Sequence, residues 1–82
     1  MAQKHTVRIW STSHCPWCHK TKEWLKAHSI EYTDINVEHD QKAAAEMIEK
    51  SGQRGVPVIE IDGKKIIIGF NEPALKKALE IA

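Results

Sequence analysis

Residues that favour β-strands gather in short runs along this chain, and between the runs apolar side chains recur every three or four positions. Val7 to Ser11 is the first β-rich run, and Tyr32 to Val37 is a second, in which polar and apolar residues alternate. Between them, Cys15 and Pro16 open a stretch with helical spacing that extends to His28. A helix between two strands predicts a parallel pair joined by a crossover connection.

The second half of the chain adds a helix, a hairpin and a last helix. Gln41 to Lys50 has helical spacing, whereas Val58 to Ile61 and Lys65 to Ile68 are β-branched runs. The turn signal Asp62-Gly63-Lys64 joins these two runs into an antiparallel hairpin. A final helix starts near Pro73, and its apolar face is expected to consist of Ala74, Leu75, Ala78, Leu79 and Ala82.

This order of elements, βαβαββα, predicts a single α/β domain over residues 1–82. A chain of 82 residues has room for one core, because an independent domain usually needs ~50 residues or more. The crossover helix and the hairpin together predict a four-stranded mixed sheet with helices on both faces. That is the plan of a minimal thioredoxin-like fold.

Composition and charge narrow the classes of partner. The chain is 41% hydrophobic and 28% charged, and no apolar run approaches the ~20 residues that span a bilayer. Twelve basic against eleven acidic residues, both scattered along the chain, provide no electrostatic surface for nucleic acid or anionic lipid. The first residues lack the apolar core of a secretory signal. We therefore expect a cytoplasmic protein that binds neither nucleic acid nor membranes.

The chemistry of the chain centres on its two cysteines, in the segment Cys15-Pro16-Trp17-Cys18. A disulfide over so short a loop would constrain the unfolded chain little, which favours a chemical role over a structural one. Backbone N–H groups and the positive end of the helix dipole stabilise a thiolate at Cys15, and Pro16 suits the first helical turn. Basic side chains nearby add to this effect: His14, His19, Lys20 and Lys22.

These positions predict distinct roles for the two sulfurs. Cys15 is the candidate nucleophile, because its sulfur lies at the helix start. Cys18 lies one turn further on and is expected to point inward, from where it can attack a mixed disulfide at Cys15 and release the bound thiol. Trp17 would offer an apolar face beside the exposed sulfur.

The same cysteine spacing also occurs in zinc sites, iron–sulfur sites and structural bridges. Cys15 to His19 spells the attachment signature of c-type haem, but that chemistry belongs to exported chains. A zinc site would have to use His14, Cys15, Cys18 and His19, whose side chains point in different directions at a helix start. The position of the pair between a strand and a helix favours redox chemistry.

Three motifs in order give the chain a specific resemblance. With CPWC after the first strand, Gly55-Val56-Pro57 before the third and Gly69-Phe70-Asn71 after the fourth, the chain resembles a glutaredoxin over essentially its whole length. The resemblance implies a thiol-disulfide oxidoreductase that needs no bound cofactor beyond its own Cys15–Cys18 disulfide. It also implies a cis bond before Pro57, and a backbone at Val56 that pairs with the cysteinyl backbone of a bound thiol.

Glutathione is the co-substrate that the resemblance implies. Arg54, assisted by Gln53, matches the position that meets the glycine carboxylate of glutathione. The chain departs from the family at Gly55, at Ile68-Gly69, and at Asn71 or Glu72, where the family has an acidic residue for the γ-glutamyl amine. The stretch Gly69 to Pro73 is more similar to the redoxins that serve ribonucleotide reductase, which prefer thioredoxin reductase.

The expected partners are therefore disulfide-containing proteins, with glutathione or thioredoxin reductase as electron donor and the protein itself a monomer. A second interpretation is a [2Fe-2S] carrier, in which two protomers hold a cluster with one cysteine each plus glutathione. The presence of Cys18 to close a disulfide favours redox turnover. Trp10 and Trp24 are expected to be packing residues, and His5, His28 and His39 solvated side chains.

Overall fold

Four strands form one mixed sheet in the computed structural model, which describes residues 5–81. In chain order the elements are β1 (Val7–Ser11), α1 (Pro16–Ala27), β2 (Thr33–Asn36), α2 (Gln41–Ser51), β3 (Val58–Ile61), β4 (Lys65–Ile68) and α3 (Glu72–Leu79). The strand order is β2-β1-β3-β4, with β1 parallel to β2 and antiparallel to β3, and β3 antiparallel to β4. The predicted βαβαββα order and mixed sheet are confirmed.

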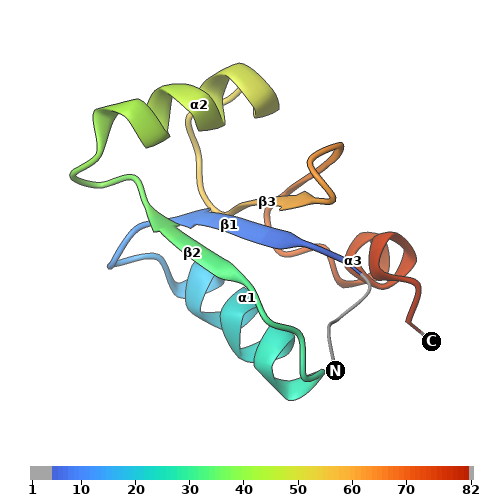
Figure 1. Cartoon of the computed structure of the whole chain (residues 1–82). Helices are drawn as coiled ribbons and strands as arrows, with labels where there is room; N and C mark the ends of the chain where they lie inside the picture. The colour runs from blue at the N-terminus through green and yellow to red at the C-terminus, as the bar shows by residue number, and fades with distance from the viewer. Residues whose placement is uncertain (1–4, 82) are drawn as a thin grey trace.

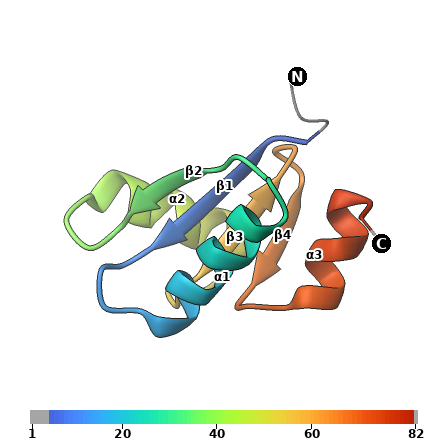
Figure 2. The same ribbon diagram turned by 90° about the horizontal axis from the view of Figure 1, so that it is seen from below.

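The helices cover both faces of the sheet, as predicted. Helix α2 lies on one face, and α1 and α3 lie side by side on the other (Figures 1 and 2). Alternate residues of each central strand point to opposite faces. The larger core lies under α1 and α3 and contains Val7, Ile9, Leu25, Ile59, Ile61, Ile67, Leu75, Ala78 and Leu79. Trp10, Met47 and Val58 form the smaller core under α2, which confirms Trp10 as a packing residue.

Side-chain caps set where the helices begin. Asp40 accepts a hydrogen bond from the Ala43 N–H at the start of α2. Helix α3 ends at Leu79, and Glu80 follows with a φ of 57°. The predicted apolar face reached to Ala82, which lies outside the described residues. The helices have 12, 11 and 8 residues, and none in the range 5–81 is long and apolar enough to cross a membrane.

A buried carboxylate ties α2 to the sheet. Glu60 on β3 is only 3% exposed and accepts hydrogen bonds from Arg8 on β1 and Lys50 on α2. Burial raises the pKa of Glu60, but the two cations outweigh burial, and the net pKa lies below its ordinary value. A charge placed between layers in this way is paired on both sides, as buried charges require.

One of the histidines predicted to be solvated is not. The side chain of His5 is 13% exposed, and its ring nitrogens lie 2.6 Å from Asp62 and 2.9 Å from Glu80. Three segments distant in sequence therefore meet at this ring, and the prediction for His5 is wrong. His39 is 86% exposed, as expected. The ring of His28 lies against the ring of Trp24, one helical turn earlier, with centroids 4.1 Å apart.

Candidate active site

Cys15 occupies the cap position of α1, directly after the loop that follows β1. Its sulfur accepts a hydrogen bond from the Cys18 N–H at 3.1 Å, so the thiol itself satisfies an amide at the helix start. The sulfur also lies 4.0 Å from the carbonyl oxygen of Val56. The sequence predicted an exposed sulfur at Cys15, and the structure shows Cys15 half-buried. Pro16 begins the helix, as predicted.

Cys18 lies beneath Cys15 and has no exposed surface. Burial, together with the neighbouring Cys15, raises the pKa of Cys18 to about 12, although the Thr12 backbone and the Lys22 charge act in the opposite direction. The predicted inward orientation of Cys18 is confirmed. One sulfur thus meets solvent, and the second stays protonated and enclosed at neutral pH.

An apolar cavity of about 250 Å³ opens beside the cysteines. Its lining comes from three separate segments and consists of Trp17, Val56, Pro57, Gly69 and Phe70. The Val56–Pro57 bond is cis, as predicted. The Trp17 ring is 55% exposed and lies 6.3 Å from the Phe70 ring, between centroids. The structure therefore brings the three sequence motifs together around one entrance.

Comparison with known proteins identifies the family of the chain. The family model described as Glutaredoxin matches residues 7–66. The chain belongs to the glutaredoxin family. A glutaredoxin-like 8.6 kDa protein, uncharacterized, from the rubredoxin operon of Clostridium pasteurianum is 51% identical over 74 residues, which cover 90% of this chain and 97% of that protein.

Solved glutaredoxin structures share the fold. The glutaredoxin from Archaeoglobus fulgidus matches with a TM-score of 0.82 and 30% identity, over 93% of this chain and 87% of that one. The glutaredoxin-like protein NrdH-redoxin from Escherichia coli matches with a TM-score of 0.76 and 26% identity, over 88% and 92%. Glutaredoxins generally act as thiol-disulfide oxidoreductases, and this glutaredoxin carries the two cysteines that such chemistry uses.

Two residues that the glutaredoxin resemblance assigns to glutathione lie away from the cavity lining. The side chain of Gln53 donates a hydrogen bond to the Gly55 carbonyl at 3.3 Å, and Arg54 is exposed in the same loop. The loop follows α2, which ends where Gly52 adopts a φ of 75°. Gln53 is thus engaged in the loop itself, whereas Arg54 is accessible to a ligand.

The residues at the γ-glutamyl position have structural partners of their own. Asn71 caps α3 by accepting a hydrogen bond from the Ala74 N–H at 3.2 Å. Glu72 accepts a hydrogen bond from Trp24 Nε1 at 2.7 Å, so Trp24 links α1 to the start of α3. Both side chains predicted near this end of glutathione therefore already have an intramolecular role.

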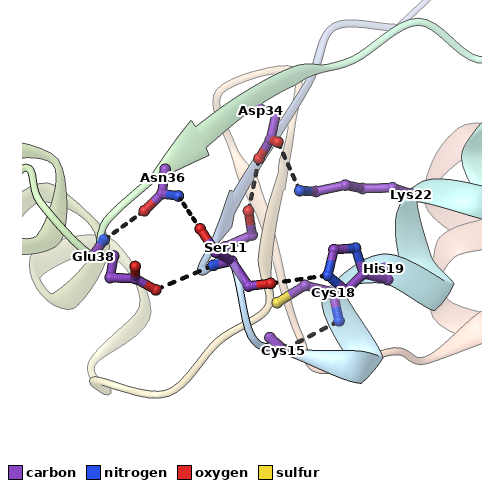
Figure 3. A network of polar contacts seen from close by, with 9 residues as sticks. Ser11, Cys15, Cys18, His19, Lys22, Asp34, Asn36 and Glu38 are labelled. Carbon is purple, nitrogen blue, oxygen red and sulfur yellow. Dashed lines mark hydrogen bonds and ion pairs between the residues drawn. The ribbon is translucent and has the colours of Figure 1, made fainter.

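The sequence did not single out a polar network behind the cysteines. Ser11 at the end of β1 donates a hydrogen bond to Asp34 on β2 at 2.7 Å, and Lys22 on α1 lies 2.6 Å from the same carboxylate (Figure 3). Burial raises the pKa of Asp34, but the bonds from Lys22 and Ser11 outweigh it and the net pKa is lowered. The sequence did contain a signal for this network: Asp34 lies in a predicted strand, and Lys22 lies one helical turn beyond Cys18.

A second group of polar contacts fixes the loop before Cys15. The Ser13 N–H donates to Glu38, its hydroxyl accepts from Asn36, and its carbonyl accepts from the His19 ring at 3.1 Å. His19, one of the basic residues expected near Cys15, is thus tied to the loop. In residues 5–81, no three His, Cys, Asp or Glu side chains are grouped so that they could hold a metal ion.

Proposed function

We propose that this glutaredoxin reduces disulfides of partner proteins, as a monomer, with Cys15 as nucleophile and Cys18 as resolving cysteine. The observation that carries the proposal is the contrast between the two thiols. Cys15 is accessible at a helix start and Cys18 is buried directly beneath it. Attack on a disulfide needs an accessible sulfur, whereas resolution needs a second sulfur within reach that incoming reagents do not meet.

The reaction then has two thiol exchanges. The Cys15 thiolate attacks one sulfur of the partner's disulfide, a mixed disulfide forms, and the other partner sulfur leaves as a thiolate that takes up a proton. Cys18 next loses its proton and attacks the Cys15 sulfur. The Cys15–Cys18 bond forms, the second partner sulfur leaves, and the partner is reduced by two electrons while this protein is oxidised.

The apolar cavity supports a protein or peptide as the substrate. Trp17 and Phe70 offer ring faces beside Cys15, and aromatic side chains supply large contact area at interfaces. The Val56 backbone lies next to the Cys15 sulfur, where an extended segment of the partner could pair with it. Main-chain pairing of this kind does not depend on the partner's side chains.

A dithiol donor such as thioredoxin reductase is favoured over glutathione. Asn71 and Glu72 are engaged at the start of α3, and losing charge-assisted contacts to the γ-glutamyl end costs ~1.5–3 kcal/mol each, which weakens binding about tenfold or more per contact. The Escherichia coli NrdH-redoxin, whose fold this chain shares, is described as having a thioredoxin-like activity profile. Accessible Arg54 is the feature that favours glutathione.

Two coupled assays with one test disulfide decide between the donors. NADPH consumption is followed with glutathione and glutathione reductase in one assay, and with thioredoxin reductase in the other. We expect turnover with thioredoxin reductase and weak, unsaturated turnover with glutathione. Saturation at micromolar glutathione would assign the protein to the glutathione system instead. Loss of turnover with both donors in Cys15→Ser is the control for the nucleophile.

A further inference from the structure

The network behind the cysteines includes a lysine on the same face of α1 as the buried Cys18. Lys22 lies four residues after Cys18, and residues with this spacing share one face of a helix. The Lys22 side chain is only 17% exposed and extends from α1 toward Asp34 on β2, which lies 2.6 Å from its Nζ (Figure 3). A long side chain at a helix surface would otherwise move freely in solvent.

Asp34 is itself held in place. Its carboxylate accepts a hydrogen bond from the Ser11 hydroxyl at 2.7 Å. Ser11 is 1% exposed and lies at the end of the central strand β1. β2 pairs in register with β1, so Asp34 lies beside Ile9 on the face that α1 covers. The sheet thus fixes the carboxylate, and the carboxylate fixes the ammonium group of Lys22.

Cys18 must ionise inside this enclosed region to resolve a mixed disulfide. Burial opposes that ionisation, and so does Cys15 when it carries negative charge. The groups that face Cys18 and favour its thiolate are the Thr12 backbone N–H after β1 and the Lys22 charge on α1. His19 faces the network from α1 and acts on Asp34. Lys22 is therefore the cationic side chain that acts on the Cys18 sulfur.

We propose that Lys22 stabilises the Cys18 thiolate during the resolving step, and that Asp34, supported by Ser11, is a positioning residue that acts through Lys22. The inference rests on the function proposed above and concerns its second exchange only. In a mixed disulfide, Cys15 carries no negative charge, so its repulsion of a Cys18 thiolate is absent and the Lys22 charge acts unopposed by it. The lysine then serves Cys18 at the stage when Cys18 has to lose its proton.

In the resolving step, one sulfur–sulfur bond forms and another breaks. The Cys18 proton passes to solvent, the thiolate forms beside the Lys22 charge, and its electron pair makes the bond to the Cys15 sulfur. The bond between Cys15 and the partner sulfur breaks, and the partner leaves with that pair and takes up a proton. Lys22 keeps its own proton throughout, so its effect is purely electrostatic.

Stopped-flow mixing of the reduced protein with dithiobis(nitrobenzoate) separates the two exchanges. Attack by Cys15 releases one coloured thiolate in a phase that depends on reagent concentration. Attack by Cys18 releases the second coloured thiolate in a phase that is independent of reagent concentration. We expect Lys22→Met to leave the first phase within about twofold and to slow the second about tenfold at neutral pH, with its pH profile displaced upward. Lys22→Arg keeps the charge and is expected to restore the second phase.

Lys26→Met is the matched control, since Lys26 is an exposed lysine one turn further along α1. It removes the same charge and is expected to leave both phases and their pH profiles unchanged. Asp34→Asn is expected to slow the second phase by less than Lys22→Met does. A faster second phase in that variant would overturn the positioning role of Asp34. Thermal unfolding of each variant shows that the fold is retained.

The two phases distinguish the role of Lys22 from the roles of the two thiols. If the second phase has the same rate and pH profile in the wild type, Lys22→Met and Lys26→Met, the role of Lys22 is overturned while the two-thiol function stands. If instead Cys15→Ser retains the first phase, or Cys18→Ser retains the concentration-independent phase, the proposed function itself is wrong. If Lys22→Met and Lys26→Met slow the second phase equally, the slowing comes from the change in net charge, and the specific role of Lys22 is also overturned.

Discussion

The two thiols are expected to differ strongly in their reaction with iodoacetamide. The thiolate is the reactive form, and raising the pKa of Cys18 from 9.0 to about 12 lowers its thiolate fraction at pH 7 about a thousandfold. Its sulfur is also closed to solvent, whereas Cys15 is half-buried. At neutral pH, Cys15 should therefore be alkylated at least about a hundred times faster than Cys18.

The assay uses the reduced wild-type protein and short pulses of iodoacetamide at several pH values. Trypsin releases both cysteines in one peptide, Ile9 to Lys20, and fragmentation between Cys15 and Pro16 assigns the label to one sulfur or the other. The same pulses on protein unfolded in guanidinium give the intrinsic rates, which should be nearly equal. If the folded protein is labelled at both positions with one pH profile, the reasoning from burial is refuted.

Three further predictions concern the apolar cavity, the buried carboxylate of Glu60 and the alternative carrier function. Trp17→Ala should raise KM for a protein disulfide roughly fivefold to tenfold in the coupled assay while leaving the reduction of a small disulfide nearly unchanged, and equal losses on both would contradict a docking role. Glu60→Gln should lower the free energy of unfolding by ~1.5–3 kcal/mol in urea titrations at neutral pH. Because the folded state lowers the pKa of Glu60, its carboxylate stabilises the fold above the ordinary pKa of 4.5, and this stabilisation is lost as the pH falls below that value. A difference in stability between the wild type and Glu60→Gln that persists at low pH would rule out the charge of Glu60 as the source. Protein purified without oxygen should show no visible absorption from iron and sulfide, since the two thiols can close a disulfide, whereas a brown dimer would favour the [2Fe-2S] carrier.

The elements of the fold were predictable because their signals are local. The start of α1 is encoded by Cys15 and Pro16, and the β3–β4 turn by Asp62-Gly63-Lys64, each within a few residues. The end of α3 was harder, since the apolar spacing runs on to Ala82 while the backbone turns at Glu80. Periodicity shows which face is apolar, but it does not show where the backbone leaves the helix.

The candidate site was predictable as far as its motifs extended. The segments around Pro16, Val56 and Gly69 were each identified from the sequence, and the structure brings them to one cavity. The pairing of Lys22 with Asp34 depends on the crossing of a helix over a strand, which no local pattern specifies. A side chain of a type that can bind a ligand can instead make a hydrogen bond within the protein, when the fold places a donor or acceptor next to it.

Asn71 has a structural role in place of the expected contact with substrate. From its type and place in the chain it was a candidate for contact with substrate, together with Gly69 and Phe70. The backbone of α3 presents the Ala74 N–H within reach, and the amide oxygen accepts that bond instead. Gly69 and Phe70 also have structural contacts, from the Gly69 N–H to the Pro57 carbonyl and from the Phe70 ring to Trp24, but these contacts leave both residues in the cavity lining.

The use of a reactive sulfur as a helix cap links redox state to backbone protection. The Cys18 N–H donates to the Cys15 sulfur, and such a cap stabilises a helix by ~1 kcal/mol. A thiolate is a stronger acceptor than a sulfur engaged in a disulfide, so the first turn of α1 is held more firmly before each reaction than after it. Hydrogen exchange at this single amide should therefore slow on reduction and quicken on oxidation. The exchange rate of the Cys18 N–H would therefore report whether the cysteine pair is reduced or oxidised.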